Sequence, residues 1–158
     1  AAEELPADAY RDDVAANLAV AERWVTEHPD TEFDFFLPPY SILFWDKVIR
    51  EGRTEAVFAA IRQAGQTLLQ YDNVKFYGYL MDPEIVTNLD NYCDYIHHSG
   101  GVCREILAML QREEGRLTEE NLEETLANWR EFVVHYDYDQ FWDERFWIQW
   151  NAEHAAAP

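Results

Sequence analysis

The chain has 158 residues, of which 48% are hydrophobic, so it holds enough apolar material for one domain with a sizeable core. Twelve basic residues against 31 acidic ones give a formal net charge of −19, which excludes a basic surface for nucleic acid and repels anionic membranes. No run approaches the ~20 apolar residues that a membrane helix needs, and residues 1–6 lack the regions of an export signal.

The first half of the chain predicts helices alternating with two strands. Apolar residues at helical spacing mark a helix over residues 8–28. Residues 33–37 form a nearly continuous apolar run stopped by two prolines, which is typical of a buried parallel strand. Two helices follow over residues 42–50 and 54–71. Residues 74–80 then alternate in polarity, which predicts a strand less enclosed than the first and a candidate for the sheet edge.

The two strands and the helices between them predict a right-handed parallel βαβ unit. The rest is expected to be a turn-rich segment over residues 83–99, helices around residues 102–110 and 118–133, and an aromatic helical tail over residues 137–158. Two strands alone make a poor sheet. We therefore expect further strands from a preceding segment of the same polypeptide or from a second copy of the chain, at the exposed flank of residues 33–37. The start at Ala1, without an initiator Met, agrees with a processed or excised chain.

The stretch from Asn88 to Ser99 follows the second predicted strand, where the sites of open α/β sheets collect. Asp94 and His97 are spaced so that, on one turn, the carboxylate can accept a hydrogen bond from one imidazole nitrogen while the other nitrogen faces outward as a base. This is the orienting half of a Ser-His-Asp triad. Taken alone, Asp-x-x-His is more often a helix start at which Asp caps and His packs.

Three segments together resemble the C-terminal half of bacterial cell-surface proteins of the SGNH (GDSL-like) hydrolase family. They are Phe-Phe-Leu-Pro-Pro-Tyr-Ser (residues 35–41), Asn-Val-Lys-Phe-Tyr (73–77) and Asn-Leu-Asp-Asn-Tyr-Cys-Asp-Tyr-Ile-His (88–97). The resemblance implies an α/β fold, a partial flavodoxin-like (SGNH-type) three-layer unit with two parallel strands and about five or six helices. It implies that residues 1–158 are one domain, the C-terminal part of a larger one. It also implies Asp94 and His97 as catalytic acid and base, and a cell-surface or extracellular location in bacteria.

The other blocks of that family do not occur in this chain. No Gly-Asp-Ser turn supplies a nucleophile, no Gly and Asn blocks supply an oxyanion hole, and the only serines, Ser41 and Ser99, are better interpreted as helix caps. An oriented imidazole without these groups gives little acyl transfer. The leading hypothesis is a portion of an esterase or acyltransferase for acylated cell-envelope glycans that is inactive in isolation. The alternative is a non-catalytic interaction module that assembles through its open sheet edge or its aromatic tail.

Other interpretations of the same stretch remain open. Asn88, Asp90 and Asn91 are candidate substrate-binding residues, because their polar side chains can hydrogen-bond to the hydroxyls of a glycan. Turn formation explains the same three residues equally well. Cys93, Asp94 and the adjacent histidines carry donor atoms for zinc, yet the spacing fits no established site, so no metal and no cofactor is expected. A Cys93 nucleophile beside His97 is a weaker option. The redox state of Cys93 and Cys103 is left open, and the aromatic tail suits either a partner platform or core packing.

Overall fold

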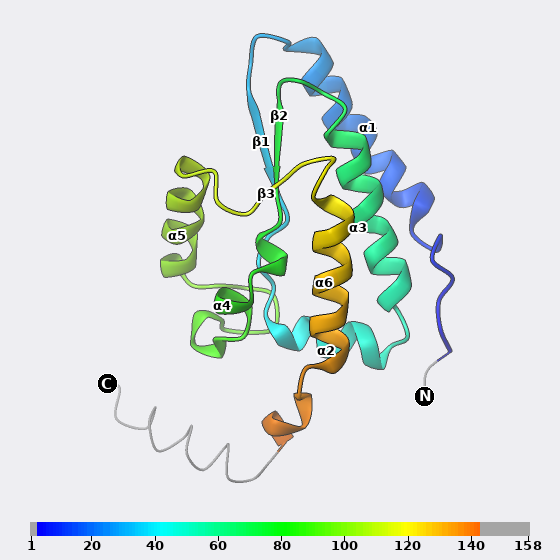
Figure 1. Ribbon diagram of the computed structural model, residues 1–158, viewed down its shortest axis with the longest axis vertical. Coiled ribbons are helices and arrows are strands. Elements are labelled where there is room, and N and C mark those ends of the chain that lie inside the picture. Colours follow the sequence, from blue (N-terminus) through cyan, green and yellow to red (C-terminus); the bar gives the residue numbers. More distant parts are fainter. Residues whose placement is uncertain (1–2, 143–158) are drawn as a thin grey trace.

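The strands of the sheet lie in the order β1-β2-β3, so the middle strand carries both pairings. β1 (Phe33–Phe36) runs parallel to β2 (Val74–Tyr77), and β3 (Arg116–Leu117) pairs antiparallel with the end of β2. The elements are those of a computed structural model, which describes residues 3–142 (Figure 1).

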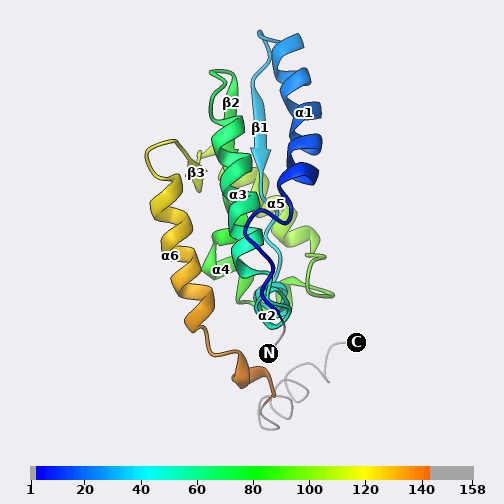
Figure 2. The same ribbon diagram turned by 90° about the vertical axis from the view of Figure 1, so that its right-hand side faces the viewer.

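Helices cover both faces of this small sheet. The α-helices of the described residues are α1 (Arg11–Glu27), α2 (Ile42–Arg50), α3 (Thr54–Leu68), α4 (Pro83–Val86), α5 (Gly100–Gln111) and α6 (Leu122–His135), and 3₁₀ turns cover Tyr79–Met81, Leu89–Asn91 and Tyr138–Trp142. Figure 2 shows α1, α3 and α6 over one face, with α1 on the β1 side, and Figure 1 shows α5 on the other face. Within residues 3–142 no helix is long and apolar enough to cross a membrane.

Two hydrophobic cores hold these layers together. The larger core lies on the face covered by α1, α3 and α6, and its centre is the fully buried Trp45 of α2. The Trp45 ring lies 5.2 Å from that of Phe58 and 6.0 Å from that of Trp129, measured between ring centroids. On the opposite face, a smaller core packs α5 against the stacked rings of Tyr77 and Tyr79. The alternation of side chains along the strands supplies both cores at once.

The two parallel strands exchange the roles that the sequence predicts for them. β1, expected to be enclosed, is an edge strand on which Asp34 and Phe36 are exposed. β2, expected at the edge, is the central strand and is buried at Val74, Phe76 and Tyr77. The reason is β3, a two-residue strand that the sequence did not predict and that occupies the second side of β2. The predicted parallel pair is therefore confirmed, and the expectation that the chain contributes only these two strands is wrong.

The observed elements form a mixed α/β fold with a small, partly parallel sheet. The predicted helices of the first 135 residues are present, because each carries apolar residues at helical spacing. The flavodoxin-like, SGNH-type arrangement is not confirmed, since the described residues contain one parallel pair and one antiparallel pair. Residues 143–158 of the predicted aromatic tail lie outside the described residues.

A buried leucine and an exposed leucine, each on a helix, allow the contribution of the larger core to stability to be tested. Leu126 of α6 is 1% exposed and Leu107 of α5 is 61% exposed. We expect Leu126→Ala to lower the free energy of unfolding by about 2–5 kcal/mol, because it opens a cavity in the larger core. Leu107→Ala is expected to change it by less than about 0.5 kcal/mol. Urea denaturation measures both values, and equal losses in the two variants would contradict this packing of α6.

Candidate functional site

Residues 88–99 form a closed surface loop between α4 and α5. Tyr92 and His98 face each other in an antiparallel bridge. The loop is closed by backbone bonds from Cys93 N to His97 O (3.0 Å) and from Ser99 N to Asn91 O (2.7 Å). These bonds fix the backbone of the loop, so its side chains have defined positions on the surface.

Hydrogen bonds connect this loop to Pro39 and Ser41, which follow β1 in the chain. The Tyr92 hydroxyl donates to Pro39 O at 2.8 Å, and burial raises the pKa of that hydroxyl. The buried Ser41 donates to Tyr95 O through both its backbone N–H (3.0 Å) and its hydroxyl (2.9 Å). Ser41 stands at the N-cap position of α2, but its side chain does not cap the helix. The loop therefore lies beyond the carboxyl end of β1, the end at which sites in parallel sheets are expected.

Asp94 and His97 make the hydrogen bond that their spacing predicts. Asp94 Oδ2 lies 2.6 Å from Nδ1 of His97, while Oδ1 accepts from the backbone N–H groups of Ile96 (2.8 Å) and His97 (2.7 Å). The backbone N–H of His97, then its ring, then Ile96 N–H lower the pKa of Asp94 to about 2. The carboxylate thus builds the turn and orients the ring at the same time.

The surroundings of this pair are those of an open surface. The side chains of His97 and Asp94 are 68% and 44% exposed, and neither lines a described cavity. Neither serine hydroxyl bonds to His97: Ser41 bonds to Tyr95 O, and Ser99 accepts from Val102 N as the cap of α5 (3.4 Å). The catalytic role of Asp94 and His97 remains a prediction.

The three candidate substrate-binding residues lie in the same loop. Asn88 Oδ1 accepts from Asp90 N (3.2 Å), and Asn91 Nδ2 donates to Ile85 O (3.0 Å). The Asn88 side chain therefore stabilises the turn, as Asn commonly does in loops, and the Asn91 side chain joins the loop to α4. Binding of a substrate by Asn88, Asp90 and Asn91 stays a prediction.

The cysteines do not form the arrangements considered from the sequence. Cys93 Sγ lies 3.4 Å from the backbone oxygen of His97 and not against its ring. Cys103 Sγ lies 3.6 Å from Nδ1 of His98. Within residues 3–142 no group of three or more His, Cys, Asp or Glu side chains is placed to hold a metal ion. The donor atoms that a zinc site in this loop would need are therefore not brought together within residues 3–142.

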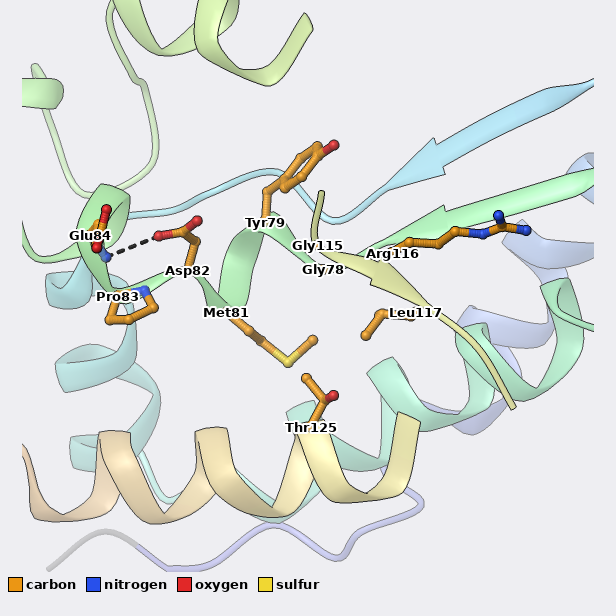
Figure 3. Close-up of a pocket in the computed structure, with 10 residues that line it drawn as sticks. All are labelled: Gly78, Tyr79, Met81, Asp82, Pro83, Glu84, Gly115, Arg116, Leu117 and Thr125. Atoms are coloured by element: carbon orange, nitrogen blue, oxygen red, sulfur yellow. Dashed lines mark hydrogen bonds between the residues drawn. The ribbon is translucent and has the colours of Figure 1, made fainter. Parts of the chain in front are cut away.

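A cavity of about 350 Å³ opens beyond the carboxyl end of β2, a feature that sequence reasoning missed (Figure 3). Met81, Leu117 and Thr125 point into the same space in Figure 3, while the Tyr79 ring points away from them. Asp82 accepts from Glu84 N at 3.0 Å and caps α4. The remaining lining residues are Gly78, Pro83, Gly115 and Arg116. The cavity volume lies at the lower end of the range found for ligand sites, and few polar groups converge on it.

The free edge of β1 is the most distinctive surface of the fold. Phe33 N and Leu37 N donate toward β2, to Asn73 O and Tyr77 O, both at 2.9 Å. Because successive residues of a strand point their backbone groups to opposite sides, those of Asp34 and Phe36 point away from β2. No described strand pairs with that side. Phe36 is 41% exposed, and the centroid of its ring lies 5.9 Å from that of the Tyr79 ring.

The low pKa of Asp94 makes stability depend on acid in a defined direction. A carboxyl whose pKa falls from 3.8 to about 2 on folding stabilises the fold above pH 3.8, and this contribution is lost as the pH falls toward about 2. His97→Gln removes the ring bond but keeps the backbone bond, so we expect the pKa of Asp94 to rise only part of the way to 3.8. Carboxyl ¹³C NMR measures both midpoints. A wild-type midpoint near 3.8, or complete recovery of that value in His97→Gln, would contradict this geometry.

Comparison with known proteins yields distant relatives. No family model matches the chain, and no solved structure matches it. Curated proteins from Lacticaseibacillus casei and Lacticaseibacillus paracasei are each 24% identical to it over 90 residues. Both are named UPF0735 ACT domain-containing protein. The matched region is 57% of this chain and 62% of each relative, so the chain spans less than two thirds of their length.

These relatives overturn the predicted family. The SGNH resemblance implied an esterase or acyltransferase, whereas these relatives are named for an ACT domain and not for a hydrolase. The SGNH assignment and the esterase, acyltransferase and cell-envelope functions drawn from it are therefore wrong. The physical reason is that an Asp-x-x-His contact is a local turn, which forms without the rest of a catalytic site. The non-catalytic alternative agrees better with the relatives.

Proposed function

We propose that this chain is a non-catalytic interaction module that assembles with a second copy of itself through the free edge of β1. The observation that carries the proposal is the outward-facing backbone of Asp34 and Phe36, which no described strand covers. An exposed strand edge is a template for pairing with another strand. The name of the distant relatives refers to a domain and to no reaction, which supports a non-catalytic role.

A twofold axis beside Phe35 gives the pairing its simplest geometry. Two β1 strands then run antiparallel, with Asp34 of one copy opposite Phe36 of the other. Each such pair exchanges both backbone hydrogen bonds, so the edge amides and carbonyls of both copies are satisfied. The same surface serves both partners, as a closed dimer requires.

The side chains at this edge fit that arrangement on one face. Phe36 already contacts Tyr79, so a second copy laid beside it extends an aromatic surface that is half covered. Asp34 would neighbour the Phe36 ring of the second copy and not an acidic residue directly. Like charges therefore do not face each other across the pairing.

Charge and area limit the strength of the contact. Each copy carries a net charge of −19, so two copies repel at long range, and added salt screens that repulsion. Strands of four residues provide a contact well below the ~1,600 Å² of a standard interface. We therefore expect a weak, reversible dimer that becomes tighter as the salt concentration rises.

Sedimentation velocity over a concentration series tests the dimer. Raising NaCl from about 0.05 M to about 0.5 M is expected to increase the dimer fraction, because the Debye length falls from about 14 Å to about 4 Å. Asp34→Pro removes an N–H that faces outward, so it is expected to abolish the dimer while leaving the β1–β2 pairing intact. Asp34→Asn is the matched control, which keeps the N–H and is expected to keep the dimer.

Phe36→Lys provides a second block that leaves the backbone unchanged, since it places a charge beside the pairing. A chain that stays monomeric at every concentration and at both salt concentrations would rule out the second copy as the occupant of this edge. A dimer that survives both Asp34→Pro and Phe36→Lys would place the interface elsewhere.

Ester hydrolysis tests whether the chain is non-catalytic. We expect neither the wild-type chain nor His97→Ala to hydrolyse p-nitrophenyl acetate faster than free imidazole does, because His97 has no serine partner on this surface. Circular dichroism of both proteins controls for folding. Turnover that His97→Ala removes would refute the non-catalytic assignment.

A further inference from the structure

Cys93 lies within the surface loop, whereas Cys103 lies in α5, and the two thiols meet different neighbours. Cys103 Sγ lies 3.6 Å from Nδ1 of His98, whereas Cys93 Sγ donates to a backbone oxygen, that of His97, at 3.4 Å. Both thiols are free and exposed. We infer that Cys103, assisted by the imidazole of His98, is a site of reversible covalent modification by small disulfides.

The backbone holds the thiol and the imidazole together. His98 is part of the bridge with Tyr92, and its neighbour Ser99 donates to Asn91 O at 2.7 Å. Cys103 belongs to the amino-terminal part of α5, where its N–H donates to Ser99 O at 3.2 Å. The contact therefore joins two backbone segments whose positions are already fixed by hydrogen bonds.

The surroundings of Cys103 leave its thiol accessible to small molecules. The glycines at positions 100 and 101 place no side chain there, and the guanidinium of Arg104 lies 3.8 Å and 4.0 Å from where their β-carbons would be. The Arg104 guanidinium thus lies at the amino-terminal end of α5.

The reaction is a thiol–disulfide exchange that balances within itself. His98 takes the proton of the Cys103 thiol, and the thiolate attacks one sulfur of a disulfide R–S–S–R. The bond from Cys103 to S–R forms as the original S–S bond breaks, and the leaving R–S⁻ recovers the proton. The Cys103 sulfur is oxidised and the leaving sulfur is reduced, so the incoming disulfide is the only oxidant. At Cys93 the thiol faces a carbonyl oxygen, which cannot act as the base.

This inference stands independently of the β1 dimer, because α5 and the loop do not belong to the free edge. It also uses neither Asp94 nor His97. A failure of the dimer proposal therefore leaves the thiol inference to be judged by its own experiment.

Two single-cysteine proteins test the difference directly. Cys93→Ala leaves only Cys103, and Cys103→Ala leaves only Cys93. The probe is 4,4′-dithiodipyridine, because a neutral disulfide is not repelled by a chain of net charge −19. At neutral pH we expect Cys103 to react about fivefold to tenfold faster than Cys93, because only Cys103 has an imidazole placed to take the proton of its thiol.

The imidazole is tested in the Cys93→Ala background. His98→Gln is expected to remove most of the rate advantage of Cys103 and to shift the pH profile of its reaction, while the matched control His97→Gln leaves both unchanged. Incubation with glutathione disulfide followed by mass spectrometry is expected to show the mixed disulfide at Cys103 before Cys93. Equal rates for the two cysteines would overturn the inference without relying on any His98 variant. A Cys103 rate and pH profile that His98→Gln does not alter would also overturn it.

Discussion

Four residues of β1 lie in parallel register against four residues of β2, and the rest of the structure depends on this pairing. At one end the side-chain amide of Asn73 reaches the backbone oxygens of Val25, His28 and Thr31, which ties the α1–β1 connection to the start of β2. At the other end Leu80 N donates to Leu37 O at 3.1 Å. The pairing therefore sets both ends of the sheet, and it also determines which backbone groups of β1 are left facing outward.

The position of the surface loop follows from the same pairing. The chain leaves β1 through Pro39 and Ser41, and both residues bond to the loop of residues 88–99. Asp94 then serves the loop as a turn-forming carboxylate, which accounts for its three contacts with Ile96 and His97 without invoking catalysis. A local motif with the geometry of a catalytic pair is thus explained by the folding of one loop.

Features set by nearby residues were predictable from the sequence, and features set by distant residues were not. The periodic apolar residues of α1, α3, α5 and α6 predict each of these helices, and the spacing of Asp94 and His97 predicts their hydrogen bond. The strand β3 has only two residues, which is too short for any periodic signal, so the sequence predicted the exposed flank of β1 but not that β2 is the central strand. The bond from Ser41 to Tyr95 spans 54 positions, and no local pattern indicates it. The family resemblance misled because it rested on short segments and lacked the blocks that carry catalysis.

The central claim is that the outer side of β1, which no strand within residues 3–142 covers, pairs with a second copy of the chain. Residue-resolved amide hydrogen exchange at increasing protein concentration measures this most directly. The amides of Asp34 and Phe36, which face outward, are expected to exchange rapidly in dilute solution and to become protected as the concentration rises, while those of Phe33 and Leu37 stay protected throughout. Exchange of Asp34 and Phe36 at one unchanging rate over the whole concentration range would contradict the account.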